Sequence, residues 1–407
     1  MYDIIIIGAG VSGLTSAISA KTHKPDLNIL VLEKQNKCGR KLSASGNGKC
    51  NVTNALFETE CYHSSDRNFV SAFAFSHSPD EVKDFFDYCG IPLYNNNGYY
   101  YPMSNQAKQV TGKLLELCER LGIEILTDKE VVNISSADGR YIVYTDSDEY
   151  IGNNVIIASG SNAADKLGGS ESGYTLVDKL GLSVTTLYPG LSPIFVKDDK
   201  LSVAKGVRLN GTATLHIEGF VKKESGQIQI NEDNLSGIVM MNLSCYLPAF
   251  NNELYKDSLW LDVMPLFSWD ELKDYIELQC QKQKDETVRS MLEGFLPAAF
   301  VRYFLLRLSI KDDIRLCHLT EKQINKITSN IKKLTFTPVL QSDYSKAQVT
   351  LGGVSISEIN PQTFECIRYP GMYVVGELLD MTGKCGGYNI TFAILSGISA
   401  ANNILFS

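Results

Sequence analysis

The sequence predicts an α/β protein in which a Rossmann-type domain is interrupted by a β-rich insert with a small helical subdomain. Three observations carry this prediction. The chain opens on an apolar run that leads into spaced glycines, its middle holds a run of strictly alternating apolar residues, and two helix-capping boxes follow that run. These patterns indicate a strand buried on both faces, a strand with one wet face, and amphipathic helices.

The first unit of the chain is a strand, a glycine-rich turn and a helix. Four consecutive isoleucines suit a strand buried on both faces, as in a parallel sheet. Gly8 permits the tight turn, Gly10 lets the backbone approach a pyrophosphate, and Gly13 lets helix and strand pack closely. Glu33 follows the next apolar run, 20 positions after Gly13, where a carboxylate can accept both ribose hydroxyls of an adenosine. This unit predicts a dinucleotide site without choosing between NAD and FAD.

Domain boundaries follow from changes of pattern along the chain. Pro189 and Pro193 precede the strand of alternating apolar residues between Val207 and Ile217, and capping boxes begin helices at Ser268 and Thr320. Helices are also expected from Pro79, over Ala107–Leu121 and from Phe392, with short strands around 131–134, 141–144 and 155–157. We expect a discontinuous cofactor-binding domain of residues 1–190 and 345–407, a β-rich insert of 191–266 and 336–344, and a helical subdomain of 267–335.

Composition restricts the class of protein. A formal charge of −8 over 407 residues argues against a broad nucleic-acid or anionic-membrane surface, so we expect neither kind of partner. No window approaches a membrane span or a secretory signal, which predicts a cytoplasmic protein. The ten cysteines form no C-x-x-C pair and the five histidines form no spaced cluster, so we expect reduced thiols and no metal.

The C-terminal segment favours a flavin over a nicotinamide as the resident cofactor. The chain has one GxGxxG motif, and a second strand ends on Gly376 and Glu377 near its C-terminus. Glu377 or Asp380 could accept hydrogen bonds from ribityl or ribose hydroxyls at the carboxyl end of that strand. The run from Gly386 to Ile390 enters a helix near Thr391, whose N-terminal end suits the flavin N1–C2=O edge. These features predict FAD.

The chain resembles the BaiN/RdsA-type NAD(P)/FAD-dependent oxidoreductase family, which includes aminoacetone oxidase-like flavoproteins, over nearly its whole length. The resemblance rests on Gly8–Gly13, Glu33–Lys34, Gly39–Asn54, Gly352–Val354, Glu358–Thr363, and Gly376–Asp380 with Gly383 and Cys385–Asn389. It implies a glutathione-reductase-like FAD-binding domain with a β-barrel-like insert that carries a helical subdomain. The segment from Gln229 to Gly237 lacks the Thr-His and Gly-Pro expected there, so the substrate preference of the family is not carried over.

The resemblance also implies which residues contact FAD. Arg40, Lys41 and the Ser45–Gly48 loop would follow the pyrophosphate and flavin, and the main chain of Val132 would meet the adenine. Together with the motifs above, the predicted cofactor-binding residues are Gly8, Gly10, Ser12, Gly13, Glu33, Lys34, Gly39, Arg40, Lys41, Ser45, Gly46, Asn47, Gly48, Val132, Ser159, Gly160, Gly376, Glu377, Asp380, Gly386, Gly387, Tyr388, Asn389 and Ile390.

No catalytic acid or base is evident in the sequence. Cys50 and Cys385 lie in the cofactor motifs and are candidates for a position near the flavin ring, although buried cysteines are commonly inert. Tyr101 belongs to the aromatic loop Tyr99–Pro102, which could cap the flavin, line a substrate cavity or lie at a domain interface.

Several functions stay open at this point. The first is a FAD-dependent oxidoreductase that oxidises a small amine or amino-ketone with dioxygen. The second is a flavin reductase of an unsaturated small molecule that uses NAD(P)H as a transient electron donor. The third is a catalytically idle FAD-binding module that senses redox state or scaffolds a partner. The negative charge disfavours a tRNA-modifying flavoprotein.

Overall fold

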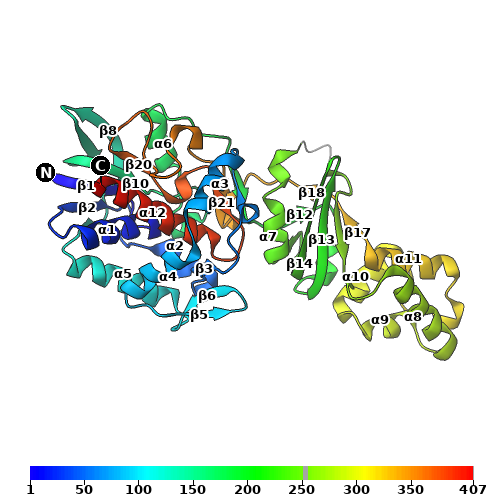
Figure 1. The fold of residues 1–407 in the computed structure, drawn as a ribbon. Helices are drawn as coiled ribbons and strands as arrows, with labels where there is room; N and C mark the ends of the chain where they lie inside the picture. The colour runs from blue at the N-terminus through cyan, green and yellow to red at the C-terminus, as the bar shows by residue number, and fades with distance from the viewer. Residues whose placement is uncertain (251–254, 407) are drawn as a thin grey trace. The chain divides into compact units, whose positions relative to one another are not determined.

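The computed structural model describes residues 1–250 and 255–406 (Figure 1). The chain divides into two compact units, one of Met1–Pro189 with Asp343–Ser407 and one of Gly190–Ser342. We call them the Rossmann unit and the insert. Within the described residues, no helix has the length and apolar character that crossing a membrane requires.

The Rossmann unit is built on a mainly parallel sheet. Strand β1 (Tyr2–Ile7) lies between β2 (Ile29–Leu32) and β10 (Glu149–Ile157), parallel to both, and β7 (Glu124–Leu126) pairs with β2. Ile4 to Ile7 are buried, and they pair residue for residue with Ile29 to Leu32. The predicted strand with two buried faces is therefore present.

Strand β10 brings the C-terminal segment into this sheet. One edge of β10 pairs with β1 from Gly152 to Ile157. On the other edge, its first half pairs antiparallel with β9 (Arg140–Thr145), which continues to β8 (Val131–Ala137), and its last residues pair parallel with β20 (Met372–Val374). The carboxyl ends of β1, β2, β10 and β20 consequently lie at one edge of the sheet, where ligands of open α/β sheets bind.

Helices α1 (Val11–His23) and α12 (Tyr388–Phe406) lie side by side in the Rossmann unit (Figure 1). Gly397 allows this approach, because a Cβ built on it would lie 2.7 Å from the carbonyl oxygen of Ser12. Helix α12 begins at Tyr388, earlier than the predicted starts at Thr391 or Phe392, since the Thr391 amide already donates to the Gly387 carbonyl. The other elements are α2 (Arg40–Ala44), β3 (Thr53–Asn54), β4 (Tyr62–His63), α3 (Arg67–Ser76), α4 (Pro79–Tyr88), β5 (Leu93–Asn96), β6 (Tyr99–Pro102), α5 (Ala107–Arg120), α6 (Ser172–Lys179), β11 (Tyr188–Gly190), β19 (Val349–Leu351) and β21 (Thr382–Gly383).

The insert contains a curled seven-stranded sheet. Its order is β17 (Leu334–Phe336), β16 (Leu259–Asp262), β13 (Arg208–Ile217), β14 (Phe220–Ile230), β15 (Asn234–Ser236), β12 (Ile194–Val196) and β18 (Pro338–Val339). Strands β17 and β18 end this path on opposite sides, yet only Thr337 separates them in the chain. The sheet must therefore curl until its two edges meet, which is the predicted barrel-like form.

Helices α7 (Ile238–Ser244), α8 (Trp269–Lys282), α9 (Val288–Glu293), α10 (Ala298–Leu308) and α11 (Glu321–Lys332) complete the insert. Both predicted capping boxes are formed, at Ser268 with Glu271 and at Thr320 with Gln323. The sheet and these helices share one hydrophobic cluster, which includes Leu261, Phe304 and Ile327. Strand β17 begins at Leu334, inside the range predicted to be helical, because Leu334 pairs with Leu261.

Candidate functional site

The glycine-rich turn after β1 separates two steric roles. Gly8 has φ +105°, and a Cβ on it would lie 2.4 Å from the carbonyl oxygen of Ala158. A Cβ on Gly13 would lie 2.0 Å from the carbonyl oxygen of Gly8, so helix and strand pack too closely there for a side chain. Nothing lies within 4 Å of the same position on Gly10. The turn therefore leaves space at Gly10, where the predicted pyrophosphate would approach.

The N-terminal end of α1 faces this space without a side-chain cap. Gly10 is the N-cap residue, it makes no side-chain hydrogen bond, and the first helical turn holds no acidic residue. The first amides of a helix lack partners within the helix, and the helix dipole favours an anion there. An uncapped helix end beside an open glycine fits the phosphates of a dinucleotide.

Glu33 lies beside the turn, as the ribose-binding prediction requires. One carboxylate oxygen accepts from the amide of Ala9 and the other from the amide of Gln35, each at 2.8 Å. These bonds fix the end of β2 against the glycine turn. A carboxylate oxygen can accept more than one hydrogen bond, so both oxygens keep capacity for hydroxyl donors.

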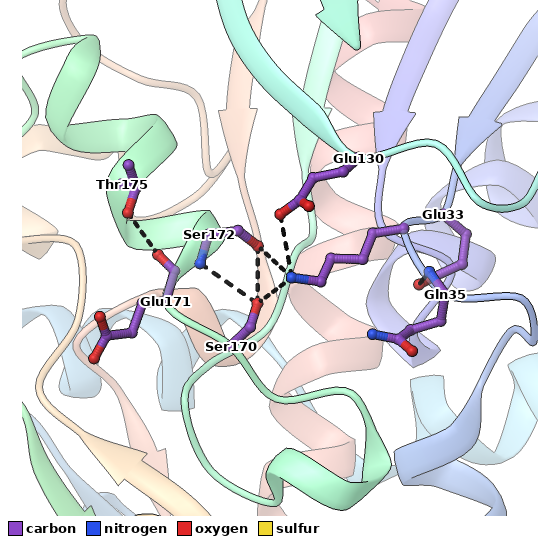
Figure 2. Close-up of polar contacts among 8 residues, drawn as sticks. Glu33, Gln35, Glu130, Ser170, Glu171, Ser172 and Thr175 are labelled. Atoms are coloured by element: carbon purple, nitrogen blue, oxygen red, sulfur yellow. Dashed lines mark hydrogen bonds and ion pairs between the residues drawn. The ribbon is translucent and has the colours of Figure 1, made fainter. Parts of the chain in front are cut away.

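Lys34 is committed to a polar network (Figure 2). Its Nζ lies 3.1 Å from Oε1 of Glu130 and 3.0 Å and 3.4 Å from the hydroxyls of Ser170 and Ser172, which are themselves 2.8 Å apart. The ammonium thus ties the end of β2 to the chain entering β8 and to the start of α6. Sequence reasoning found Lys34 but missed its partners, which lie about a hundred residues or more away along the chain.

Arg40, predicted to lie beside the pyrophosphate, borders a basic cavity. Arg40 donates to Oε1 of Gln35 at 2.8 Å and to the carbonyl of Lys166 at 2.7 Å. A cavity of about 520 Å³ lies beside it, lined by Lys34, Gln35, Asn36, Lys37, Arg40 and Asp128. Three of these six side chains are basic and one is acidic, so the cavity suits an anionic group.

Lys41 and Glu377 join two predicted cofactor segments. Nζ of Lys41 lies 2.7 Å and 2.6 Å from the two carboxylate oxygens of Glu377, and the hydroxyl of Ser161 donates to the same carboxylate at 2.8 Å. The sequence did not indicate Ser161 as a site residue, although it directly follows the predicted cofactor-binding residues Ser159 and Gly160 at the end of a strand. Gly376 precedes this carboxylate at φ +70°, where a Cβ would lie 2.6 Å from the hydroxyl oxygen of Ser12.

The predicted flavin loop holds an unusual backbone. Gly46, Asn47, Gly48 and Cys50 all have φ between 54° and 84°. Residues 46–49 are exposed, whereas the Cys50 side chain is buried. Left-handed non-glycine residues cost about 1–3 kcal/mol each and cluster at functional sites. Burial raises the pKa of the Cys50 thiol to about 11, which keeps it protonated near neutral pH and favours a packing role over a redox one.

The segment after the predicted flavin loop (residues 45–50) meets the hairpin of β5 and β6 and the glycines Gly386 and Gly387. Strand β3 pairs Thr53 with Tyr100 and Asn54 with Tyr99. A Cβ atom on Gly387 would lie 2.8 Å from the amide nitrogen of Thr53, and a Cβ atom on Gly386 would lie 3.3 Å from Cε1 of Tyr99. The Tyr99 ring therefore lies against Gly386. Sequence reasoning had selected Tyr101, whose ring packs near that of Tyr94 with centroids 6.0 Å apart.

Other predicted residues serve the protein framework. The Asn389 side chain bonds both the amide and the carbonyl of Gly383, at 2.8 Å and 2.7 Å. Asp380 is buried, accepts from the amide of Ser65 at 3.2 Å, and has its pKa raised by burial. Tyr388 is buried at the start of α12, and Ile390 and Cys385 are half-buried. Of the remaining predicted residues, Gly39 precedes α2, Ser45 begins a short 3-10 helix and Gly160 follows the end of β10.

Two predicted positions lie at the expected adenine site and at the end of β10, and they differ in whether their polar atoms have partners. Val132 lies in a bulge of β8, outside the pairing of Val131 and Asn133 with β9, and its carbonyl accepts from Lys179 at 2.9 Å. The buried Ser159 hydroxyl makes no hydrogen bond to the described residues. A buried hydroxyl without a partner is uncommon, so Ser159 fits a ligand that supplies one. Together with the open glycine turn, it makes the site compatible with FAD.

Comparison with known proteins decides the family. The profile described as the HI0933-like protein Rossmann domain matches residues 2–403. The chain belongs to the HI0933-like family. This confirms the resemblance to BaiN/RdsA-type oxidoreductases, and with it the Rossmann-type FAD-binding fold predicted for the chain.

Two curated relatives match this chain over nearly its full length. It is 29% identical over 402 residues to a 3-dehydro-bile acid delta(4,6)-reductase of Clostridium scindens, covering 98% of both chains. It is 26% identical over 408 residues to a ribosomal RNA dihydrouridine synthase of Escherichia coli, covering 99% of this chain and 98% of that one.

Solved structures share the fold. A 3-ketosteroid delta1-dehydrogenase from Sterolibacterium denitrificans matches with a TM-score of 0.52 at 12% identity, covering 99% of both chains. A 3-ketosteroid-delta4-(5alpha)-dehydrogenase from Rhodococcus jostii matches with a TM-score of 0.50 at 14% identity, covering 99% of this chain and 96% of that one. At these identities the likeness concerns the fold alone.

Proposed function

We propose that this protein is a FAD-dependent reductase that adds hydrogen across a ring carbon–carbon double bond conjugated to a carbonyl. NAD(P)H is the proposed electron donor. A small cytoplasmic molecule with such a ring is the expected substrate. Of the functions that the sequence left open, we therefore favour the NAD(P)H-dependent flavin reductase over the amine or amino-ketone oxidase.

The names of the two full-length relatives carry the proposal. A delta(4,6)-reductase of a 3-dehydro bile acid saturates double bonds conjugated with the ring ketone, and a dihydrouridine synthase saturates the double bond conjugated with a uracil carbonyl. The two substrates differ greatly in size and polarity. What they share is hydride addition to a carbon β to a carbonyl, and this shared step is the one we propose for the chain.

The site supports this chemistry through the residues that would hold the cofactor. The uncapped start of α1 and the open side of Gly10 would receive the pyrophosphate, Glu33 the ribose, and the exposed 46–49 loop with the start of α12 the isoalloxazine end. Bound FAD would supply two-electron transfer between a nicotinamide and a substrate carbon. The chain's own task is to position the ring and keep other acceptors away.

Anaerobic flavin reduction tests the proposal. We expect a yellow protein that releases FAD on denaturation and whose flavin absorbance bleaches on mixing with NADH or NADPH. Adding a 4-en-3-one steroid or uridine should then restore the absorbance without oxygen and yield a product heavier by two hydrogens. The matching saturated compounds serve as controls and should leave the flavin reduced.

The alternatives give different results in the same experiment. Bleaching by amines but not by a nicotinamide would replace the proposal with the amine or amino-ketone oxidase. A flavin that neither donor reduces would favour the catalytically idle module. A colourless protein that fails to take up FAD would overturn all three.

A further inference from the structure

Four tyrosines gather on the hairpin of β5 and β6, beside the predicted isoalloxazine end. They are Tyr94, Tyr99, Tyr100 and Tyr101. Strand β6 pairs with β3, which follows the predicted flavin loop, so the hairpin is fixed against a cofactor-binding segment. Saturation of a carbon–carbon double bond needs a proton as well as a hydride, and a positioned phenol can supply one. The surroundings of the four hydroxyls show which of them is available.

Three of these hydroxyls are poorly placed to deliver a proton beside Gly386. The Tyr94 hydroxyl donates to Oδ1 of Asn105 at 2.7 Å. The Tyr100 side chain leaves the opposite side of β6 from the two tyrosines next to it in the strand. Tyr101 pairs with Tyr94 in the hairpin, its ring packs near the Tyr94 ring, and burial raises its pKa. The fourth tyrosine has none of these restrictions.

Tyr99 differs from the other three in its contacts and its exposure. Its ring lies against Gly386, and 36% of its surface is exposed. Its hydroxyl makes no hydrogen bond to the residues that the structure describes. Gly386 stands two residues before Tyr388, at which α12 begins. The phenol of Tyr99 is therefore free to donate a proton near the helix end that the flavin is expected to meet.

Asn54 holds Tyr99 and Gly386 in place relative to each other. Its backbone pairs with Tyr99 across β3 and β6, and its side-chain amide donates to the Gly386 carbonyl at 3.2 Å. Its side-chain oxygen accepts from the amide of Leu56 at 3.0 Å, so both polar atoms of the side chain are fixed. A donor whose ring is positioned in this way can act on one defined atom of a bound molecule.

Neighbouring titratable groups are less suited to proton donation. The Tyr388 ring also lies near Gly386, where a Cβ would meet its Cε2 at 3.1 Å, but Tyr388 is buried. Burial raises the pKa of Tyr388 and the pKa of the Cys50 thiol. Lys41 is held by both carboxylate oxygens of Glu377. An exposed hydroxyl without a partner can exchange its proton with water more readily than these groups can.

We propose that Tyr99 is the proton donor of the reaction, a role that rests on the function proposed above. The carbon β to the carbonyl takes up a hydride from reduced FAD, and the electron pair of the double bond moves to form the enolate. The α carbon of this enolate then takes the hydroxyl proton of Tyr99, and the tyrosinate regains a proton from water. Two C–H bonds replace the double bond, and NAD(P)H supplies the two electrons.

Anaerobic reoxidation of the reduced holoenzyme tests the proposal. The flavin is reduced with dithionite and mixed with 4-androstene-3,17-dione or uridine, and the return of flavin absorbance is followed. We expect Tyr99→Phe to slow this return about 100-fold or more, the range for loss of a general acid. Flavin reduction by NAD(P)H should keep its wild-type rate, and so should reoxidation by ferricyanide, which takes electrons without protonation of a carbon. Tyr88→Phe on α4 is the matched control, because Tyr88 is also exposed, and it should leave every rate unchanged.

Nitration by tetranitromethane, measured by mass spectrometry, gives a second test that needs no turnover. FAD should protect Tyr99 and leave Tyr88 open to nitration. The proposal is overturned if Tyr99→Phe is reoxidised as fast as wild type, if the slow step appears in Tyr101→Phe or Cys385→Ser instead, or if FAD does not protect Tyr99. Wild-type flavin that neither unsaturated compound reoxidises would overturn the proposed function and the proton donor together, so the two failures are distinguishable.

Discussion

Replacing two neighbouring glycines separates cofactor approach from packing in the glycine-rich turn. Gly10 has φ −78° and ψ −176°, which any residue adopts, and a Cβ on it meets nothing within 4 Å. Gly10→Ala should therefore leave the apoprotein as stable as the wild type, or up to about 1 kcal/mol more stable, because alanine restricts the unfolded chain. The added methyl group would occupy space that the pyrophosphate needs. We expect FAD to bind at least about tenfold more weakly, equivalent to ~1.4 kcal/mol.

Gly13→Ala should behave in the opposite way. Its Cβ would lie 2.0 Å from the carbonyl oxygen of Gly8 and 3.2 Å from Cγ2 of Ile6, so the backbone of the turn must move. Overpacking of this kind costs about 1–3 kcal/mol, and a backbone contact this short belongs at the upper end. Better helix propensity returns about 1 kcal/mol. The net loss of about 2 kcal/mol should lower the Tm of the apoprotein by about 4–8 °C.

The assay compares the two variants as apoproteins and with FAD. Thermal unfolding is followed by circular dichroism after the flavin has been removed, and FAD affinity is measured by quenching of flavin fluorescence. Gly10→Ala should lose affinity at unchanged Tm, and Gly13→Ala should lose Tm. If Gly10→Ala bound FAD as tightly as the wild type, the pyrophosphate would not approach this residue, and the predicted orientation of the cofactor would be wrong.

Three further predictions concern other parts of the molecule. Tyr99→Ala should raise flavin fluorescence and the KM for a ring substrate, because the tyrosine ring that lies against Gly386 is lost. Tyr99→Phe keeps an aromatic ring and should leave both quantities near wild type. Equal flavin spectra in all three proteins would show that the Tyr99 ring lies away from the flavin. In the insert, Arg307→Leu should cost about 3 kcal/mol in urea unfolding, because the buried Asp198 carboxylate, 3.1 Å away, loses its cation and keeps only the Tyr303 hydroxyl and the Lys200 amide as donors. Arg315→Leu at the exposed pair with Asp285 should cost less than about 1 kcal/mol. Burial alone would raise the pKa of Glu81, but hydrogen bonds from His77 and the Ser78 amide outweigh burial and lower that pKa. The stability gained from Glu81 should therefore be present above its unfolded pKa and be lost as the pH falls through its lower folded pKa. Glu81→Gln should be less stable than wild type at pH 7 and equal to it in strong acid, and a difference in stability that persists in acid would contradict this.

Features with local causes could be predicted from the sequence. The strand, turn and helix around Gly8, Gly10 and Gly13 depend on neighbouring residues, and so do the capping boxes at Ser268 and Thr320. For such elements the conformation is decided within a few positions of the chain.

Contacts between distant segments could not be predicted in the same way. Lys34 carries a positive charge at a suitable position, but its partners Glu130 and Ser170 come from other strand and helix ends. The sequence singled out Tyr101 within the loop Tyr99–Pro102, but it does not show the pairing of Asn54 with Tyr99, which brings the Tyr99 ring against Gly386. Tyr99 and Tyr101 are two residues apart and so lie on the same side of β6, which means that only the position of each residue along the strand, set by the pairing with β3, decides which ring reaches Gly386.

The free energy of cofactor binding should come mainly from groups that have no partner in the protein. Glu33 and Glu377 already accept hydrogen bonds, from two amides and from Lys41 with Ser161, so a hydroxyl ligand shares or exchanges bonds there and gains little. The uncapped start of α1 and the buried Ser159 hydroxyl have no such bonds to lose. We therefore expect the two acids to select and orient the ligand. We expect the glycine turn, which leaves the helix end open, to supply the larger part of the affinity.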